Sequence, residues 1–498
     1  MLDGLIALFS SPLALVLMVV AVPIGMVFGA IPGLGGKIAL ISVMPFLIGL
    51  DTLAGCVFLI SLHAVVHTGA AAPTILLGIP GTGPSTAVVL DGHSMTKNGD
   101  GTRAITAAAI ASGIGGVVGT ICLALIVPFA LSLMKQISYP EIFLLTLFGL
   151  GFCALLSGSG LVKGVIVGCL GLTIAFVGKE TTYGVERLTF DLDVFYGGIN
   201  LVTAVLSMFA IPEMLRVGRK AQISQTEILP RADVFRQIAL GAADIVKHRW
   251  LTLRTSVMGV IVGIIPGLGG DVAAWLCYGH AAQSSDHPEK FGKGAVEGVI
   301  GPEAANNSKE GGSLVPTLFL GIPGSSGMAI FLIALVPLGV SPGLSFVEQN
   351  NGLIWAMVWA LALSNILAAV TLVALSGVLQ RLARVPVHLL VPYVYLLAMA
   401  SIYIASNDWR FFVVMIAMSA IGYAFLVLDW PRAPFVIGLI LGPEAETSLV
   451  KSLSIWGPEF LLRPVSLLMI ATLLFSMHRM SRRLMAHAKI AKDHIDAS

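Results

Sequence analysis

Long apolar runs recur along this 498-residue sequence, and they limit the folds that the chain can adopt. A helix that crosses a bilayer needs about 20 consecutive residues of mainly apolar character. Only 11% of the residues are charged, whereas soluble proteins carry about 25%, so a soluble fold is excluded. The main runs are Leu13–Phe28, Ile105–Leu133, Val165–Val177, Ser256–Ile265, Ile354–Leu375, Phe412–Leu428 and Ser466–Met477. With the shorter runs between them, they predict an all-α polytopic membrane protein with about 10–13 membrane segments.

The N-terminal segment and the cysteines point to no secretion signal and no metal framework. No Lys or Arg precedes Lys37, so the basic segment that begins a cleavable signal peptide is missing. We therefore expect the first apolar run to be kept as a helix. The five cysteines are scattered singly through apolar stretches, and we expect them to be small core residues.

Two motifs occur twice in the chain, in the same order. The segment Gly29–Gly36 recurs as Gly263–Gly270, an offset of 263 − 29 = 234 residues. The segment Pro73–Gly81 recurs as Pro316–Gly324, an offset of 316 − 73 = 243 residues. The difference between the offsets fits a longer polar loop in the second half. Paired motifs in one order predict two structural repeats that arose by duplication.

These motifs and the charge pattern divide the chain into four predicted parts. They are a first repeat at 1–215, a cytoplasmic linker at 216–249, a second repeat at 250–478 and a basic cytoplasmic tail at 479–498. The positive-inside rule places the Lys- and Arg-rich linker and tail in the cytoplasm. The linker is either an amphipathic helix along the membrane surface or a plain solvated connector. We expect inverted repeats with discontinuous helices or re-entrant hairpins, although the segment boundaries do not settle their orientation.

Four breaks rich in Pro and Gly interrupt the apolar segments, two in each half. Such residues interrupt the backbone hydrogen-bond ladder, and lipid offers no water to the freed groups. Breaks at corresponding positions of two repeats indicate a transporter's binding site, because helix N-termini attract anions and unwound carbonyl groups hold cations. The alternative is close helix packing through small residues. The predicted substrate-binding residues are Pro32, Gly33, Gly35, Gly36, Lys37, His67, Pro80, Gly81, Thr82, Ser85, Pro323, Gly324, Ser325 and Ser326.

A second set of residues is predicted to bind a cation. Asp271 directly follows the break at Pro266–Gly270, whereas the corresponding position of the first half is Lys37. Carboxylate and amide oxygens within Glu303–Asn307 can ligate sodium. Glu303 follows Pro302, so it can also be a simple acidic residue at a helix N-terminus. The predicted cation-binding residues are Gly267, Gly269, Asp271, Glu303, Asn306 and Asn307.

The chain shows no arrangement of residues that is typical of catalysis. His63 and His67 have the spacing that puts two imidazoles on one helical face, but Ala64 stands where a zinc protease has its glutamate base. We therefore predict no metal site, and we expect His67 to act as a hydrogen-bonding group beside the break at Gly78–Gly83. The Gly-rich turns lack the Gly-Lys-Ser/Thr ending of a nucleotide-binding loop. We expect no cofactor and no enzyme activity; a membrane enzyme and a membrane scaffold are the alternatives from other classes.

Several stretches are similar to those of a known family. They are the two Pro-Gly-Leu-Gly segments, Pro80-Gly81 followed by Asp91-Gly92, His287–Gly294, Glu297–Val299, Pro302–Asn307, Leu320–Gly324, Arg187–Phe190 and Gly438–Pro443. At these residues the chain resembles the large membrane subunit of the tripartite tricarboxylate transporters, the TctA family. The resemblance extends over nearly the whole chain.

This resemblance implies a multi-pass subunit of a secondary transporter in the bacterial inner membrane. Its implied partners are a small TctB-like membrane subunit and a periplasmic TctC-like solute-binding protein, which delivers a di- or tricarboxylate or a related organic acid. The resemblance implies import by alternating access, driven by a cation gradient, with Na⁺ as the coupling ion. A self-sufficient ion-coupled organic anion symporter is the alternative. Membrane lipid is a further expected partner, and no nucleic acid is expected.

The first half departs from the family pattern at two places. His67-Thr68-Gly69-Ala70 stands where the family has Tyr-Gly-Gly-Ser, and Gly78 stands where an Asn precedes Ile-Pro-Gly. The first half therefore offers fewer polar ligands, whereas the second half keeps Glu303–Asn307. We hypothesise that the Lys37 ammonium replaces a bound cation in the first half.

Overall fold

The computed structural model describes most of the chain and divides it into two compact units. The described residues are 1–31, 34–78, 80–134, 138–144, 146–147, 161–179, 185–200, 203–204, 206–218, 231–265, 269–343, 346, 349–375, 391–464, 466–467 and 470–471. Unit 1 combines Met1–Ser132 with Asn200–Leu426, and unit 2 combines Leu133–Ile199 with Val427–Ser498. Each unit therefore takes segments from both halves of the sequence. The predicted division into repeats, linker and tail stays a prediction, and the tail at 479–498 lies outside the described residues.

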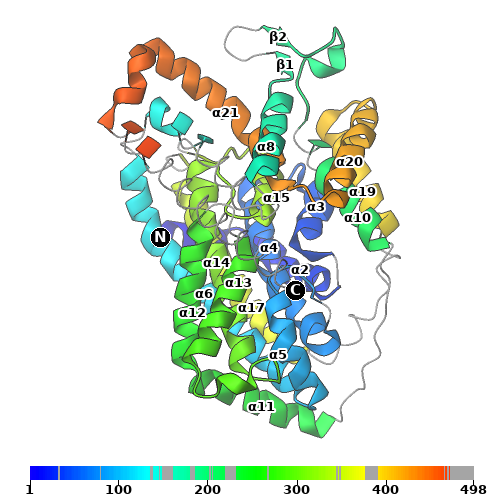
Figure 1. Ribbon diagram of the computed structural model, residues 1–498, viewed down its shortest axis with the longest axis vertical. Helices are drawn as coiled ribbons and strands as arrows, with labels where there is room; N and C mark the ends of the chain where they lie inside the picture. The colour runs from blue at the N-terminus through cyan, green and yellow to red at the C-terminus, as the bar shows by residue number, and fades with distance from the viewer. Residues whose placement is uncertain are drawn as a thin grey trace, which may run out of the picture. The chain divides into compact units, whose positions relative to one another are not determined.

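All regular secondary structure among the described residues of unit 1 is helical (Figure 1). Its α-helices are α1 (Leu2–Ser10), α2 (Pro12–Ala30), α3 (Gly35–Leu47), α4 (Thr52–Leu77), α5 (Thr86–Lys97), α6 (Gly101–Met134), α10 (Ile211–Gly218), α11 (Arg231–Lys247), α12 (Arg249–Ile264), α13 (Gly269–Ser284), α14 (Glu297–Leu320), α15 (Ser326–Leu335), α17 (Asn351–Ala374), α19 (Val391–Ser406) and α20 (Phe411–Val427). A π-helical turn at Leu206–Ala210 and 3₁₀ turns at Pro288–Lys290 and Val336–Leu338 complete it.

The duplicated motifs fold in the same local way in both halves. The first motif separates α2 from α3 and α12 from α13, and the second separates α4 from α5 and α14 from α15. Helices α4 and α14 both end at a glycine with a left-handed backbone, Gly78 with φ 67° and Gly321 with φ 66°. A glycine is needed there because a side chain disfavours this conformation. The orientation of the two repeats relative to each other stays a prediction.

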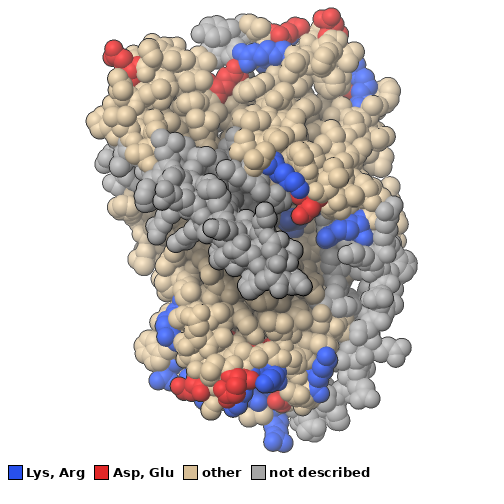
Figure 2. Space-filling model, in the orientation of Figure 1, with Lys and Arg blue, Asp and Glu red and all other residues tan. Residues whose placement is uncertain are grey.

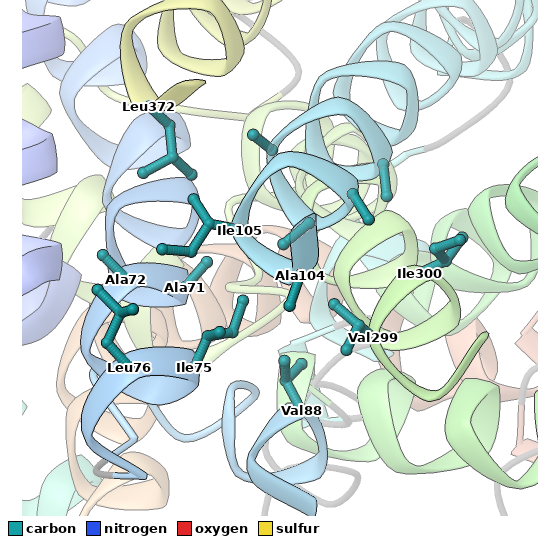
Figure 3. Close-up of a cluster of buried hydrophobic side chains, with 14 of the residues drawn as sticks. Ala71, Ala72, Ile75, Leu76, Val88, Ala104, Ile105, Val299, Ile300 and Leu372 are labelled. Carbon is teal, nitrogen blue, oxygen red and sulfur yellow. The ribbon is translucent and has the colours of Figure 1, made fainter. Parts of the chain in front are cut away.

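The interior of unit 1 forms around α4 and α14. The most extensive helix contacts are those of α2 with α4 and of α12 with α14. Figure 3 shows one hydrophobic cluster, in which Ala71 and Ile75 of α4, Ile105 of α6, Val299 of α14 and Leu372 of α17 lie close together. Small residues predominate on α4 and α6, so the helices approach closely, as in other membrane helix bundles. The centre of α4 is thereby enclosed by protein.

Four described helices are long and apolar enough to cross a membrane: Pro12–Ala30, Thr52–Leu77, Gly101–Phe129 and Asn351–Ala374. Helix α6 exposes the large apolar side chains of Leu125 (73%) and Phe129 (70%), as expected for a surface in contact with lipid. Four further apolar helices are 10–17 residues long. These observations support a multi-pass membrane protein, whereas the segment count of about 10–13 stays a prediction.

Helix α14 has 24 residues, which is enough to span a bilayer, but its sequence includes Glu297, Glu303, Lys309 and Glu310. Except for Glu297, these charged side chains are almost completely buried. A charged side chain at the bilayer centre costs about 2.5–3.5 kcal/mol on insertion scales and usually has a function. Helix α14 is therefore a long helix whose charges face protein.

Helix α11 shows that part of the predicted linker is helical. Its Asp244 accepts hydrogen bonds from the Nε of Arg103 at 2.6 Å and from its Nη2 at 2.9 Å, at the start of α6. Side chains such as Phe235 (72% exposed) and Val246 (64%) lie on its outer surface. In Figure 2, charged side chains gather at the lower end of the view, where Figure 1 places α11. The structure thus agrees with an amphipathic helix; residues 219–230 of the linker lie outside the described part.

Among its described residues, unit 2 contains the long helices α8 and α21 and a short hairpin. Helix α8 (Leu161–Ala175) packs against α21 (Ala433–Trp456), which continues into a 3₁₀ segment at Gly457–Leu462. Strands β1 (Gly178–Lys179) and β2 (Glu186–Arg187) pair antiparallel, followed by a 3₁₀ turn at Asp193–Phe195. The Arg187 guanidinium forms an ion pair with Glu446 of α21. The sequence analysis did not predict this hairpin, because two-residue strands are too short to show alternation.

Candidate functional site

The four predicted breaks lie next to one another within unit 1. A Cβ added at Gly35 would lie 3.7 Å from Thr82 Cγ2, so the first break touches the second. A Cβ at Gly270 would lie 2.6 Å from Pro84 Cγ, which joins the third break to the second. A Cβ at Gly269 would lie 4.0 Å from Ser325 Cβ, which joins the third break to the fourth. The structure therefore brings together the segments that the sequence analysis singled out.

Each break leads into the N-terminus of a helix. Helices α3, α5, α13 and α15 begin directly after the four breaks, and the first amide groups of a helix carry partial positive charge. The Ser325 Oγ accepts a hydrogen bond from Met328 N at 3.2 Å and caps α15. The Ser85 Oγ lies 2.8 Å from Thr82 Oγ1 at the start of α5. Converging helix N-termini of this kind favour an anionic ligand.

Matching hydrogen bonds hold the two breaks that follow α4 and α14. Gly81 N donates to Thr74 Oγ1 at 3.2 Å, and Gly324 N donates to Thr317 Oγ1 at 3.1 Å. Each threonine hydroxyl in turn donates to a carbonyl one turn earlier, at Ala70 and Ser313. A buried backbone N–H needs such a partner where the helix has ended. A threonine hydroxyl thus holds both breaks in the same way.

The breaks surround a buried charged cluster formed by His63, His67, Lys309 and Glu310. The Nε2 atoms of His63 and His67 lie 3.2 Å and 2.9 Å from the two different carboxylate oxygens of Glu310. Neither contact has hydrogen-bond geometry. Lys309 forms an ion pair with the same carboxylate. All four side chains are at least nine-tenths buried, so α4 and α14 share a set of charges that water does not reach.

Three breaks contact this charged cluster directly. A Cβ at Gly36 would lie 3.4 Å from His63 Nδ1, and one at Gly327 would lie 2.7 Å from His63 Cε1. A Cβ at Gly270 would lie 3.1 Å from Lys309 Nζ. Glycine at these positions lets the backbone of each break approach the charged side chains.

Helix α14 presents a row of buried polar side chains, which we call the polar stripe: Glu303, Asn306, Glu310, Ser313 and Thr317. Residues spaced three and four apart lie on one helical face, and Glu310 shows that this face meets α4. The Asn306 side-chain oxygen and nitrogen and the Ser313 Oγ lack a hydrogen-bond partner among the described residues. Buried polar groups without protein partners are candidates for ligand contacts.

The predicted cation residues of α14 have distinct surroundings. Glu303 Oε2 accepts a hydrogen bond from Ser112 Oγ of α6 at 2.7 Å, whereas its Oε1 has no partner among the described residues. Asn307 Nδ2 donates to Thr68 Oγ1 and to Asn365 Oδ1, both at 2.8 Å. The amide nitrogen of Asn307 therefore ties α14 to α4 and α17. Glu303 Oε1, Asn306 Oδ1 and Asn307 Oδ1 have no hydrogen-bond partner among the described residues and are free to bind a cation.

The other predicted site residues are placed as follows. Gly35, Gly36 and Lys37 begin α3, and Lys37 Nζ lies 5.8 Å from the ring centroid of Phe209. Pro80 is exposed and Gly81 is buried between α4 and α5. Gly269 and Asp271 begin α13, and Pro323 and Gly324 precede α15, which starts at Ser326. Pro32, Gly33 and Gly267 lie outside the described residues, as do the side chains of Asp271 and Ser326.

Sequence reasoning missed the charged partners of His67. Lys309 and Glu310 stand inside a 24-residue helix, and a pair of charges in such a segment is itself a signal of function. The offset between the second motifs makes His67 and Glu310 equivalent positions of the two repeats, because 67 + 243 = 310. The sequence analysis expected His67 beside the break at Gly78–Gly83. In the structure His67 contacts Glu310, and the imidazole that a Cβ at Gly78 would meet is that of His93.

Comparison with known proteins gives one family and two relatives. The family model described as "Tripartite tricarboxylate transporter TctA family" matches residues 15–437. The "Uncharacterized 52.8 kDa protein in TAR-I ttuC' 3'region" of Agrobacterium vitis is 27% identical over 446 residues, 89% of this chain and 88% of the relative. The "Uncharacterized protein in TAR-II ttuC' 3'region" of the same organism is 30% identical over 197 residues, 40% of this chain and 81% of the relative. No solved structure matches the chain.

The matched residues 15–437 include all four breaks, the charged cluster and the polar stripe. The family match thus covers the whole candidate site and both occurrences of each duplicated motif. This chain belongs to the tripartite tricarboxylate transporter TctA family.

Proposed function

We propose that this protein is the large transmembrane subunit of a binding-protein-dependent secondary transporter that imports a di- or tricarboxylate or a related organic acid. Membership of the TctA family supports a transport role in a multi-pass membrane protein. The observation that carries the proposal is that the four helix breaks lie next to one another, three of them beside the charged cluster shared by α4 and α14. Transporters place substrate and coupling ions at such paired breaks.

The substrate carboxylates bind to the helix N-termini at the breaks. Amide groups at the starts of α3, α5, α13 and α15 supply partial positive charge without a formal cation. The hydroxyls of Thr82, Ser85 and Ser325 add donors at two of the breaks, and Lys37 adds a cation at the start of α3. These groups suit a small molecule with two or three carboxylates and would bind an uncharged solute only weakly.

A cation gradient drives import, and sodium is the ion proposed for α14. The free oxygens of Glu303 and Asn306 are the hard ligands that such a cation prefers. Binding of substrate and cation shifts the population between outward-facing and inward-facing states, and the gradient gives the direction. A TctB-like small membrane subunit and a periplasmic TctC-like solute-binding protein complete the transporter in the bacterial inner membrane.

The test is uptake of radiolabelled citrate, dicarboxylates and aromatic acids into proteoliposomes. Uptake is measured with and without a sodium gradient, the small subunit and the binding protein. We expect sodium-driven accumulation that requires the binding protein. Uptake without the binding protein would favour a self-sufficient symporter, and no uptake of any acid under any gradient would refute the proposal.

Two substitutions test the proposed ligands. Glu303→Gln removes a carboxylate from the polar stripe and is expected to weaken sodium dependence at least about fivefold, the lower end of ordinary coupling free energies. Lys37→Ala tests whether a fixed cation acts in the first half; unchanged sodium dependence in this variant would count against that role. Asp408→Asn is the matched control, because this partly exposed carboxylate lies in the turn between α19 and α20 and pairs with Arg410.

A further inference from the structure

We propose that His63, His67 and Glu310 form a proton-loading site, so that each transport cycle moves a proton together with the organic acid. This inference rests on the proposed transport function and goes beyond it by naming a second coupling ion and its site. The residues come from both repeats, His63 and His67 from α4 and Glu310 from α14.

The geometry places one carboxylate between two imidazoles. The two Glu310 oxygens lie 3.2 Å from His63 Nε2 and 2.9 Å from His67 Nε2, and the two imidazole rings are 5.6 Å apart. At these distances the positive charge of a proton bound to either imidazole lies close to the carboxylate, which stabilises it. Chains of Glu and His at membrane depth are typical of proton relays in transporters.

The chemistry of the ligand atoms favours a proton over sodium. Hard cations such as sodium take oxygen ligands, whereas two of the three groups here offer imidazole nitrogens. Imidazole nitrogens are bases that bind and release a proton. With both imidazoles neutral, Lys309 and Glu310 cancel and the cluster has no net charge; one bound proton makes it +1. Loading therefore changes the charge buried between α4 and α14.

The other charged groups near the cluster are few. Lys309 pairs with the Glu310 carboxylate, and Glu303 lies two turns earlier on α14, bonded to Ser112. Lys37 begins α3, with its Nζ near the Phe209 ring. Helices α2, α15 and α17 contain no titratable residue. Within the described side chains, His63 and His67 are thus the neutral bases that face the carboxylate.

Three of the four breaks adjoin this same cluster, through Gly36, Gly270 and Gly327. A change in its charge therefore acts on the N-terminal ends of α3, α13 and α15 at once. Positive charge is unfavourable at a helix N-terminus, and the negative charge of a bound carboxylate lowers this electrostatic cost. Substrate and proton should consequently bind with positive cooperativity, which is what symport requires.

The experiment measures protons delivered per molecule of organic acid taken up. The complete transporter with its small subunit and binding protein is reconstituted in vesicles that contain a fluorescent pH dye. Labelled citrate, or the dicarboxylate selected by the uptake panel, is added under a sodium gradient, and the membrane potential is clamped with potassium and valinomycin. We expect wild-type uptake to acidify the lumen in a fixed ratio to substrate.

The variants locate the proton. Glu310→Gln and the double variant Lys309→Met/Glu310→Gln should lower the proton-to-substrate ratio at least about tenfold, within the range of ordinary coupling free energies. Glu310→Asp keeps the carboxylate and should retain most of the ratio. Asp408→Asn is the control: hydrogen bonds from the Arg410 side chain hold the pKa of Asp408 below its usual range, so its carboxylate stays ionised. This variant should match the wild type.

Three results would overturn the proposal. They are wild-type uptake without lumen acidification, an unchanged ratio in Glu310→Gln, and stoichiometric zinc retained by the purified wild type, which would occupy the same nitrogens. The wild-type ratio decides whether a proton moves with the substrate even if the variants are inactive. Sodium-driven uptake without proton movement would refute the proton site alone, whereas no uptake of any acid would refute the transport function as well.

Discussion

His67 and Glu310 occupy the same position in the two duplicated segments and contact each other. The offset of 243 residues between the second motifs relates them, because 67 + 243 = 310, and His67 Nε2 lies 2.9 Å from Glu310 Oε1. Equivalent residues of two repeats can touch only where the repeats meet. The charged cluster therefore lies at the junction of the halves, where any relative movement of α4 and α14 must alter it.

Glu310→Gln should destabilise the protein far more than the double variant Lys309→Met/Glu310→Gln. The single change leaves the Lys309 ammonium buried without its carboxylate, which costs about 3–5 kcal/mol, whereas removal of both charges is often nearly neutral. Denaturant unfolding in detergent micelles measures the difference. Equal losses in the two variants would mean that Lys309 reaches water after the change and would contradict the buried ion pair.

Asp91→Asn should loosen the turn between α13 and α14. Asp91 Oδ1 accepts hydrogen bonds from Gly294 N at 2.9 Å and Ala295 N at 2.8 Å, and Oδ2 accepts one from Tyr278 Oη at 2.9 Å. An unsatisfied buried group costs about 1–3 kcal/mol. Amide hydrogen exchange at Gly294 and Ala295 should become faster. Tyr278→Phe, which removes only the hydroxyl, should leave the exchange at both amides unchanged; faster exchange in this control would contradict the assignment.

The sequence predicted the backbone of the site better than its side chains. Pro and Gly have local effects on the chain, so the breaks at Gly78 and Gly321 could be recognised from residue type and spacing alone. The convergence of the four breaks also followed from the duplication. In contrast, the ends of α11 and the short strands at Gly178–Lys179 and Glu186–Arg187 depend on contacts that no local pattern records.

The charged cluster could not be assembled from one helix. His63 and His67 were visible as a pair on one helical face, and the absence of a glutamate at Ala64 argued against a metalloprotease. Their acidic partner comes from α14, which lies 243 residues further along the chain. Only the repeat offset connects these positions in the sequence, and an offset gives equivalence rather than contact. Tertiary packing was needed to bring them together.

Arg103→Lys should weaken the attachment of α11 to the start of α6. Two nitrogens of Arg103 bind the two Asp244 oxygens, and a lysine cannot reproduce this planar pairing. Because Arg103 is partly exposed, we expect a coupling energy of only about 1 kcal/mol in a double-mutant cycle with Asp244→Asn. Thermal unfolding supplies the four stabilities. Arg249→Lys is the control, since among the described residues Arg249 donates a single exposed hydrogen bond, to Val246 O. A coupling energy of zero for Arg103 and Asp244 would show that packing alone holds α11.

Gly324→Ala and Gly81→Ala should both lower stability and slow uptake. A Cβ at Gly324 would lie 2.8 Å from Ser313 Cα, and one at Gly81 would lie 2.8 Å from Ala70 Cβ and 2.6 Å from Gly29 O. Overpacking against backbone costs about 1–3 kcal/mol. The two changes push corresponding breaks away from corresponding turns of α14 and α4, so their penalties should be similar.

Gly279→Ala is the matched control for these glycines. Gly279 lies within α13, and a Cβ there meets no atom within 4 Å. Alanine favours a helix by about 1 kcal/mol over glycine, so this variant should be as stable as the wild type or slightly more stable. Thermal unfolding and initial uptake rates are measured for all three variants. If Gly324→Ala behaved like Gly279→Ala, the break before α15 would have room to move, and its close packing on α14 could not be what positions the site.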